Sequence, residues 1–321
     1  MRVFSPSQTE EQLEHGAVID ALYHAWSQAT PPTCPPRTAH TQPRADEDDS
    51  ILLLMPCWEA ETGAAPVSGV KIVHVVPGNA DRELSSIQSS YLTFDGVTGA
   101  PTAVMDGNTL TAIRTACVGA LGARLLARQD SRVLLVIGTG AVGSQLPLAY
   151  TAALPSLEVV YVASGRVAKA EALVAVLLEQ GLDARVVGDG EGDLEAAVKE
   201  ADVIACATPA TAPLFPRAWV SPGTHIDLIG SFTPEMREVD DQTVADAEVY
   251  VDTPVAVEEA GELVQALAAG VIQESHIKGD LASLCSALVA PSQSRDPSAI
   301  TLFKAVGSGV SDLACARLVL Q

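Results

Sequence analysis

Residues 132–151, RVLLVIGTGAVGSQLPLAYT, place three glycines in a GxGxxG spacing directly after an apolar run. In a strand–turn–helix unit the first glycine permits the tight turn, and the second lets the backbone approach a pyrophosphate. The third allows the helix to pack closely on the strand, and backbone N–H groups face the phosphates. The pattern therefore predicts a dinucleotide site made by Gly138, Thr139, Gly140, Ala141, Val142 and Gly143.

The next predicted strand ends without the acidic residue that NAD-binding domains usually carry about twenty residues beyond the glycines. Ser164, Gly165 and Arg166 stand there instead. A hydroxyl and a guanidinium can bind a 2′-phosphate, so we predict NADPH as the cofactor, with NADH as the alternative. The competing interpretation is that Arg166 lies on the solvent face of the following helix and binds no phosphate. Thr208, after the fourth predicted parallel strand, is a candidate neighbour of the nicotinamide ribose or a loop residue without a ligand.

Two cations occupy positions where an idle surface charge is not expected. Lys71 lies in the apolar run GVKIVHVVP, and Arg114 lies one turn into a helical pattern that leads to the glycine loop. Either side chain could instead face solvent. Arg37 belongs to a segment rich in proline, where Arg44 is an equally good candidate from the sequence alone.

The elements that position these residues follow from the apolar spacing. Short apolar runs predict strands at 51–58, 69–77, 89–95 and 100–106, the last two joined by the turn DGVTGA as an antiparallel hairpin. Three-to-four-residue spacing over 109–129 predicts an amphipathic helix. From 132 onward apolar runs alternate with helical patterns, as in buried parallel sheets. Residues 31–50 predict a loop, and 302–321 predict a terminal helix.

Together these patterns predict an α/β fold: a Rossmann-type, doubly wound parallel sheet plus an N-terminal α+β domain that the C-terminal helix completes. The expected boundaries are 1–115 for the substrate-binding domain, with 303–321 returning to it, and 116–302 for the dinucleotide-binding domain. The cleft between two such domains is the default place for a ligand.

Composition excludes several classes of partner. Forty acidic residues against nineteen basic ones give a formal charge of −21, which repels nucleic acid and anionic membrane surfaces. No run of apolar residues reaches the length of a membrane span, and the amino terminus lacks the pattern of a secretory signal, so we expect a cytoplasmic protein. The six cysteines include no CxxC pair and are expected to be reduced thiols without a metal.

At MDGNTLTAIRTACVGALGARLLA, at the glycine loop and at GTHIDLIGSFTPEMREVDD, the sequence resembles the ornithine cyclodeaminase/μ-crystallin family over most of its length. The resemblance implies a homodimer whose N-terminal domains pair through their sheets. It also implies chemistry at a carbon–nitrogen double bond beside a carboxylate, which three cations hold: Arg37, Lys71 and Arg114. Thr115, next to the last of these, joins the expected cofactor residues.

One departure from the family is informative. Cyclodeaminases of the family carry an aspartate two residues past the glycine that matches Gly230, where it activates the amine or water, and this sequence has Phe232. An aromatic ring cannot accept a proton. Ser231 and Thr233 offer hydroxyls that could orient substrate or water. The family's usual arginine after the second strand also appears one position later, at Arg166.

These residues favour a member resembling the bacterial ketimine reductases, which reduce the small cyclic imino acids Δ1-pyrroline-2-carboxylate and Δ1-piperideine-2-carboxylate to L-proline and L-pipecolate. The alternatives are an ornithine cyclodeaminase with a relocated base, an alanine or N-alkyl amino acid dehydrogenase, and a μ-crystallin-like binding protein loaded with NADPH. His74, His225 and His276 lack metal-ligand spacing and are expected to be packing or surface residues.

Overall fold

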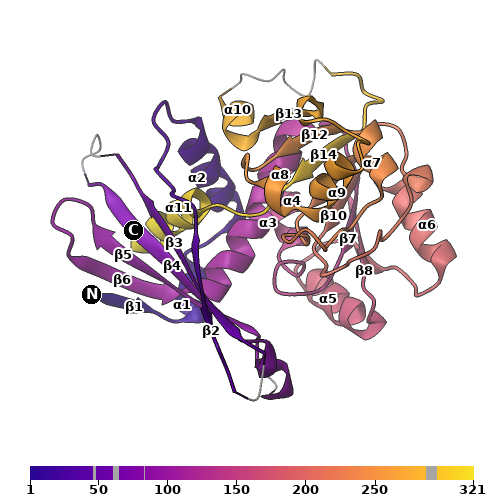
Figure 1. Cartoon of the computed structure of the whole chain (residues 1–321). Coiled ribbons are helices and arrows are strands. Elements are labelled where there is room, and N and C mark those ends of the chain that lie inside the picture. Colours follow the sequence, from indigo (N-terminus) through magenta and orange to yellow (C-terminus); the bar gives the residue numbers. More distant parts are fainter. Residues whose placement is uncertain (46–47, 61–64, 83, 287–294) are drawn as a thin grey trace. The chain divides into compact units, whose positions relative to one another are not determined.

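The computed structural model describes residues 1–45, 48–60, 65–82, 84–286 and 295–321 (Figure 1). The chain divides into two compact units, one formed by Met1–Arg114 with Ser308–Gln321 and the other by Thr115–Gly307. The first boundary lies inside helix α3 (Gly107–Leu126), and the second follows Gly307. The predicted mixed α/β fold class is confirmed, because each unit contains a β-sheet packed with helices.

The first unit is built on a six-stranded sheet in the order β1-β6-β5-β4-β3-β2. The pair β1 and β6 is parallel, and the other neighbours are antiparallel. The strands are β1 (Arg2–Phe4), β2 (Thr38–Gln42), β3 (Ser50–Trp58), β4 (Val67–Val75), β5 (Ile87–Asp95) and β6 (Pro101–Asp106). The helices are α1 (Pro6–Glu11), α2 (His15–Ser27) and the C-terminal α11 (Gly309–Leu320), with the 3-10 turn η1 (Pro77–Arg82).

The two faces of this sheet differ in burial. Lys71 is opposite Tyr91 on β5, which is in turn opposite Met105 on β6, and all three side chains are buried. Helix α11 contacts β3, β4 and α2, so the buried row faces helices (Figure 1). The alternate residues point to the other face because successive side chains of a strand alternate. That face carries apolar side chains of intermediate burial, which include Leu54, Ile72 and Leu92.

The second unit is an eight-stranded parallel sheet in the order β13-β12-β14-β11-β10-β7-β8-β9. From β7 the chain proceeds to β8 and β9 on one side, then returns to β10 on the other side of β7. This reversal is the topological switch point at which doubly wound sheets bind ligands. The strands are β7 (Val133–Ile137), β8 (Val159–Ala163), β9 (Ala184–Val186), β10 (Val203–Cys206), β11 (His225–Leu228), β12 (Glu248–Val251), β13 (Ile277–Asp280) and β14 (Thr301–Lys304).

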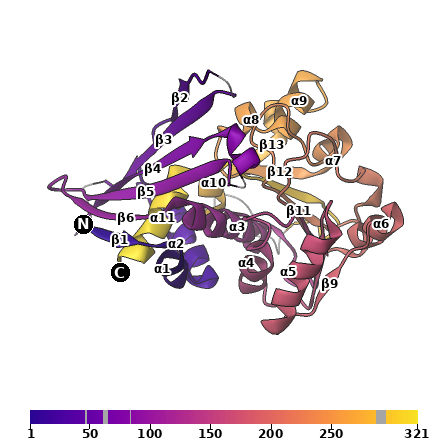
Figure 2. The same ribbon diagram turned by 90° about the horizontal axis from the view of Figure 1, so that it is seen from below.

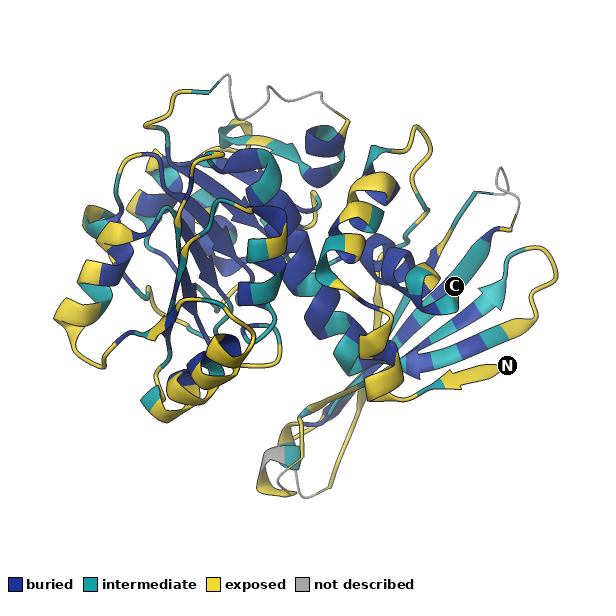
Figure 3. Ribbon diagram, turned by 180° about the vertical axis from the view of Figure 1, so that it is seen from behind, coloured by how far each residue is buried: buried dark blue, intermediate teal, exposed yellow. Residues whose placement is uncertain are grey.

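Helices cover both faces of the parallel sheet. Figure 2 shows α4 (Leu146–Ala153) and α5 (Val167–Glu179) on one side, with α6 (Glu191–Glu200), α7 (Asp241–Asp246) and α9 (Gly261–Ala268) on the other. Strands β10 and β11 lie between the two helix layers and are buried along their whole length, including the polar residues His225 and Asp227 of β11 (Figure 3). Shorter elements are α8 (Ala256–Glu259), α10 (Leu281–Cys285), η2 (Arg217–Trp219) and η3 (Glu274–His276).

Three elements differ from the sequence-based predictions. Residues 38–42, predicted as loop, form the edge strand β2; its side chains are all exposed, so no apolar pattern marks it. Residues 301–304 form β14 of the second unit, and the C-terminal helix begins only at Gly309. Gly307, three residues past the end of β14, has φ of 91°, a left-handed conformation that glycine adopts readily, and the Ser308 side chain caps the helix. The predicted return to the first domain at 303 therefore falls inside a strand, five residues too early.

Among the described residues, α3 is the one helix whose length and composition would suit a membrane span. Of the 18-residue window that qualifies, 72% is buried within the protein. The core helix of a globular protein can have the same length and composition, and the extent of its burial identifies α3 as such a core helix.

Candidate functional site

The glycine loop after β7 has the geometry of a phosphate cradle. Gly138 has φ of 118°, and a Cβ there would stand 2.5 Å from the Ala207 carbonyl oxygen. A Cβ on Gly143 would stand 2.2 Å from the Gly138 carbonyl oxygen, so the first and third glycines are fixed by the chain's own packing. A Cβ on Gly140 would meet nothing within 4 Å. Internal packing does not require this glycine, whereas close approach of a pyrophosphate would.

The backbone N–H groups of this loop support the same interpretation. Within the described chain, none of the N–H groups from Thr139 to Gly143 donates a hydrogen bond to another protein atom. Adjacent donors of this kind form an anion-binding concavity. The residues therefore fit the diphosphate of a dinucleotide.

The helix behind the loop begins later than the glycine spacing predicted. Residues 141–145 form turns, and α4 starts at Leu146. Pro147 lacks an N–H group, so an α-helical hydrogen bond back to Gly143 cannot form. The chain instead closes with bonds from Ser144 N–H to the Gly140 carbonyl and from Gln145 N–H to the Val142 carbonyl, each 2.9 Å.

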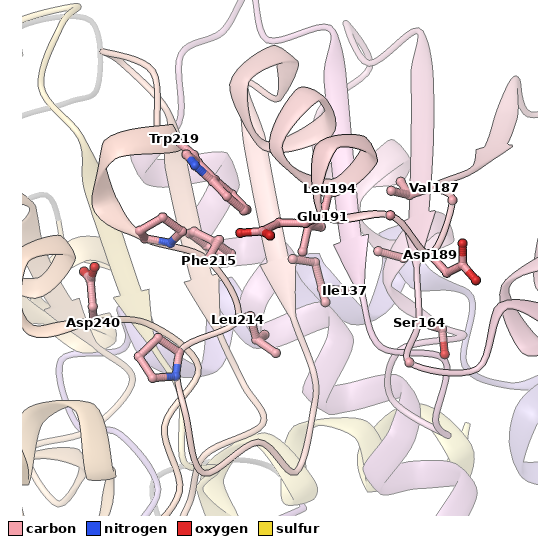
Figure 4. A pocket seen from close by; sticks show the side chains of 16 residues that line it. Ile137, Ser164, Val187, Asp189, Glu191, Leu194, Leu214, Phe215, Trp219 and Asp240 are labelled. Carbon is pink, nitrogen blue, oxygen red and sulfur yellow. The ribbon is translucent and has the colours of Figure 1, made fainter.

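A hollow of about 750 Å³ lies at the carboxyl ends of β7, β8 and β9, and Ser164 lines it (Figure 4). The Ser164 hydroxyl is 3.0 Å from the Thr139 hydroxyl and accepts a hydrogen bond from the Arg166 N–H at 3.2 Å. Arg166 is exposed at the start of α5. Asp189 and Glu191 also line the hollow, so any phosphate bound there requires a nearby cation to offset their charge.

One buried carboxylate connects the loops that follow β10 and β11. Glu238 accepts hydrogen bonds from the Thr208 N–H (2.7 Å), the Thr208 hydroxyl (2.9 Å) and the Gly230 N–H (2.8 Å). Burial, and to a lesser degree the charge of Glu262, raises the pKa of Glu238. The Thr208 hydroxyl thus has a partner, and Glu238 fixes both loops at the switch point.

The structure places Ser231 differently from its expected role. This residue is fully buried, and its hydroxyl donates a short hydrogen bond to Glu262. Glu262 also accepts the Glu238 N–H at 2.7 Å and lies 3.7 Å from the Lys304 ammonium. Ser231 therefore anchors its loop. Thr233 is half-buried two residues further on.

In the first unit, the two cations predicted from their positions converge on a third residue. Asp312 on α11 accepts a hydrogen bond from the Lys71 ammonium at 3.0 Å and one from the Arg114 Nε at 2.8 Å. The second Asp312 oxygen is 2.8 Å from the same ammonium. All three side chains are buried. Segments far apart in the sequence, β4, α3 and α11, are joined at this carboxylate.

Burial and neighbouring charges shift the pKa values of the side chains in this cluster. Burial, then the charge of Arg114, lowers the pKa of Lys71 to about 8, although Asp312 acts in the opposite direction. Burial alone would raise the pKa of Asp312, but the charges of Arg114 and Lys71 outweigh it and hold that pKa below its usual value. Arg37 also lowers the pKa of Lys71, so its charge lies near the cluster, while Arg37 itself is exposed. Arg44 lies beyond the end of β2, where its N–H donates to Asp49.

The predicted residues thus fall into two groups, one in each unit. The first unit contains Arg37, Lys71 and Arg114. The second unit contains Thr115 on α3, the 138–143 loop, Ser164, Arg166, Thr208, Ser231 and Thr233. Half-buried Thr115 directly follows Arg114 on the same helix, so α3 connects the two groups covalently.

Three of the buried carboxylates hold these groups in place and were not among the predicted residues: Asp312, Glu238 and Glu262. For Asp312 a signal was available, since it is the one acid in the apolar helix GVSDLACARLVL. A buried acid in such a helix requires a cationic partner. Glu238 and Glu262 stand among several other acids in their segments, and nothing in the spacing distinguishes them.

Comparisons with known proteins agree with this architecture. The family model described as the ornithine cyclodeaminase/mu-crystallin family matches residues 4–321, so the chain belongs to that family, as the sequence motifs predicted. Protein SAR DEFICIENT 4 of Arabidopsis thaliana is 40% identical over 84% of this chain and 82% of its own length. The Delta(1)-pyrroline-2-carboxylate reductase of Paracoccus denitrificans is 38% identical over 89% of this chain and 90% of its own.

A solved structure has the same fold along nearly the whole chain. It is the Delta(1)-pyrroline-2-carboxylate reductase of Thermococcus litoralis in complex with NADH and L-proline. The TM-score is 0.87 at 27% identity, covering 99% of this chain and 96% of that one.

Replacing Asp312 with Asn tests the buried ion cluster. We expect a loss of about 3–5 kcal/mol in the free energy of unfolding, because the substitution leaves two buried cations without their counter-charge. Urea unfolding at neutral pH measures this loss. Asp183→Asn is the matched control: it breaks an exposed pair with Arg185 (2.7 Å, about half-exposed on both sides) and should cost about 0–1 kcal/mol. Equal losses in the two variants would contradict this account of the cluster.

Proposed function

We propose that this protein is a nicotinamide-dependent oxidoreductase that reduces cyclic ketimine carboxylates, converting Δ1-pyrroline-2-carboxylate to L-proline and Δ1-piperideine-2-carboxylate to L-pipecolate. The observation that carries the proposal is the cluster around Asp312, where the buried Lys71 and Arg114 share one buried carboxylate and the charge of Arg37 lowers the pKa of Lys71. The surplus positive charge suits a substrate carboxylate. Relatives named for this reaction, and a solved relative holding NADH and L-proline, support it.

The cations have separate tasks. When bound, the reduced nicotinamide supplies a hydride to the imine carbon. Arg114 and Arg37 bind the substrate carboxylate through charge-assisted hydrogen bonds, which fix orientation as well as affinity. The Lys71 ammonium makes contacts with Asp312 and, having three N–H groups, retains a donor for the substrate. With a pKa of about 8 it is protonated at neutral pH and can deliver the proton that the imine nitrogen gains.

Loss of ammonia from ornithine is disfavoured in this chain. Phe232, at the position of the family's catalytic aspartate, is 47% exposed and offers no base. The hydroxyl of Ser231, beside it, is already bound to Glu262. The reductase proposal thus predicts no ammonia release when ornithine and NAD⁺ are supplied.

A matched pair of arginines tests the substrate site. Both Arg37 and Arg44 are exposed residues of one segment, so neither substitution removes core packing. For Arg37→Ala we expect kcat/KM for Δ1-pyrroline-2-carboxylate to fall roughly 30-fold or more, equivalent to about 2 kcal/mol or more for a lost charge contact. Arg44→Ala should change it little. Steady-state rates with purified protein decide between them, and a larger effect at Arg44 would overturn the assignment.

The proton-donor role of Lys71 predicts a pH dependence. Because the protonated ammonium is the active form, kcat/KM should fall as pH rises through about 8. Asp312 stabilises the charged form of Lys71, so Asp312→Asn should move this descending limb to lower pH. A limb caused by titration of the imine itself would stay in place in the variant, and that result would refute the assignment.

We infer NADPH as the preferred cofactor, with Arg166 as the residue that binds its 2′-phosphate. The absence of an acid at the end of β8 and the Ser164 hydroxyl bound to the Arg166 N–H support this. Arg166→Ala should raise KM for NADPH while leaving KM for NADH nearly unchanged. Rates with both cofactors measure this selectivity; the same change for both would show that Arg166 does not read the phosphate.

We infer further that two copies of the chain pair through the exposed face of the first unit's sheet. Its half-buried apolar side chains, which no described helix covers, form a continuous row: Leu52, Leu54, Val70, Ile72, Leu92 and Val104. Apolar patches of this kind on soluble proteins mark interfaces.

Ile72→Lys tests this pairing, since it buries a charge in the proposed interface. Light scattering should show a dimer for the unmodified protein and a monomer for the variant. Val97→Lys, at a hairpin tip where the side chain is 75% exposed, should remain a dimer. A monomeric unmodified protein would contradict the proposal.

A further inference from the structure

We propose that Cys34 and Cys57 form an oxidation site, at which a peroxide closes a disulfide beside the substrate-binding cluster. All six cysteines are free thiols in the structure. Cys34 and Cys57 are distinguished from the other four because the backbone places them opposite each other.

The strand register brings the two residues together. Thr33 and Trp58 form an isolated antiparallel bridge and exchange both backbone hydrogen bonds, at 2.8 and 3.0 Å. One step along each segment, Cys34 and Cys57 occupy the next, non-hydrogen-bonded pair of positions. Cα atoms of such pairs are about 4.5 Å apart, within the range of about 4.4–6.8 Å that disulfides span. The backbone therefore already has the spacing of a cross-strand disulfide.

The side chains confirm this placement. A Cβ built on Gly309 would lie 2.6 Å from the Cys34 sulfur and 3.3 Å from the Cys57 Cβ, so both cysteines reach the same small space at the start of α11. The Cys34 sulfur also lies 3.6 Å from the Pro56 carbonyl oxygen, adjacent to Cys57. Helix α11 packs here without a side chain at position 309, and the Cys34 sulfur and the Cys57 Cβ occupy that space.

The two thiols differ in access and acidity. Cys34 is half-buried, whereas Cys57 is fully buried. The hydrogen bond with Cys57 lowers the pKa of the Cys34 thiol, whereas the same bond and burial raise the pKa of Cys57, so Cys34 is the more acidic of the two. A reactive cysteine is accessible and acidic, and its resolving partner can be buried beside it.

Hydrogen peroxide is the oxidant in the proposed reaction. The Cys34 thiolate attacks one peroxide oxygen and the O–O bond breaks, which gives Cys34 sulfenic acid and a hydroxide. The hydroxide becomes water by taking up the proton that the Cys34 thiol had released. The Cys57 sulfur then attacks the sulfenic sulfur, the S–S bond forms, and the S–O bond breaks. The departing hydroxide takes the Cys57 proton as a second water. Two thiols are oxidised and one peroxide is reduced.

The bond would constrain the substrate-binding cluster. Cys34 lies three residues before Arg37, and Gly309 lies three residues before Asp312 on α11. Linking Cys34 to β3 fixes the segment that carries Arg37 and changes the packing beneath the first turn of α11. The resulting effect on catalysis rests on the proposed function, whereas formation of the bond does not.

Chemical analysis of the whole protein tests bond formation. After peroxide treatment we expect a mass lower by two hydrogens, a fall from six to four titratable thiols, and a Cys34–Cys57 linked peptide under non-reducing digestion. Cys57→Ala should stop at a dimedone-trapped sulfenic acid on Cys34, and Cys34→Ala should not react. Cys285→Ala, remote in sequence and in the other unit, should oxidise as the unmodified protein does. Six persistent thiols, or any other pairing, would overturn the proposal.

Kinetics then test the consequence. KM for Δ1-pyrroline-2-carboxylate should rise on oxidation and return after dithiothreitol, with no change in Cys34→Ala. Unchanged kinetics in protein shown to carry the disulfide would refute the effect on the cluster. If the reduced protein does not turn over this imine, the reductase proposal fails, and the linked peptide still decides whether the oxidation site exists.

Discussion

The first unit depends on the rule that a charge cannot be buried alone. The side chains of Lys71, Arg114 and Asp312 are each removed from water. Desolvation costs several kcal/mol per ion unless well-placed ion pairs and hydrogen bonds offset it. The ion cluster therefore requires β4, α3 and α11 to be assembled together. This explains why the chain leaves the first unit at residue 114 and returns at 308: without its last fourteen residues the unit would hold two buried cations and no counter-charge.

Buried carboxylates also organise the second unit, where they hold loops in place. Glu238 binds the loops after β10 and β11, and Glu262 holds the Ser231 hydroxyl and the Glu238 backbone. Both carboxylates are fully buried. They satisfy backbone and hydroxyl donors that would otherwise be buried without partners. In both units a buried acid bonds to groups from separate segments and so fixes how those segments pack.

Charge distribution explains how an acidic protein can select an anion. The chain as a whole carries a formal charge of −21, which opposes negatively charged ligands in general. Two buried cations with one counter-ion, together with the nearby charge of Arg37, reverse this sign within one region of the first unit. The glycine loop attracts phosphate by unpaired backbone N–H groups, with no basic side chain within residues 138–143. The local placement of cations and N–H groups, and not the net charge of the chain, then determines where an anion can bind.

The sequence by itself determined the features that depend on local chain order. The GxGxxG turn, the hairpin at DGVTGA and the alternation of apolar strands with helices are encoded in neighbouring residues, and the fold class and family followed from them. Lys71 and Arg114 were also identifiable, because a cation within an apolar pattern is expected to be buried and then requires a partner of opposite charge. Strand β2 escaped notice because its exposed side chains carry no periodic signal.

Only the tertiary structure decided which groups meet. Asp312 is 241 residues from Lys71 and 198 from Arg114, and Cys34 faces Cys57 through a register set by one backbone bridge. The effect of the Arg37 charge on the pKa of Lys71, and the hydrogen bond from Ser231 to Glu262, likewise depend on which segments pack together. Such pairings are decided by the burial of charge and by strand register, and both are properties of the assembled chain with no trace in local spacing.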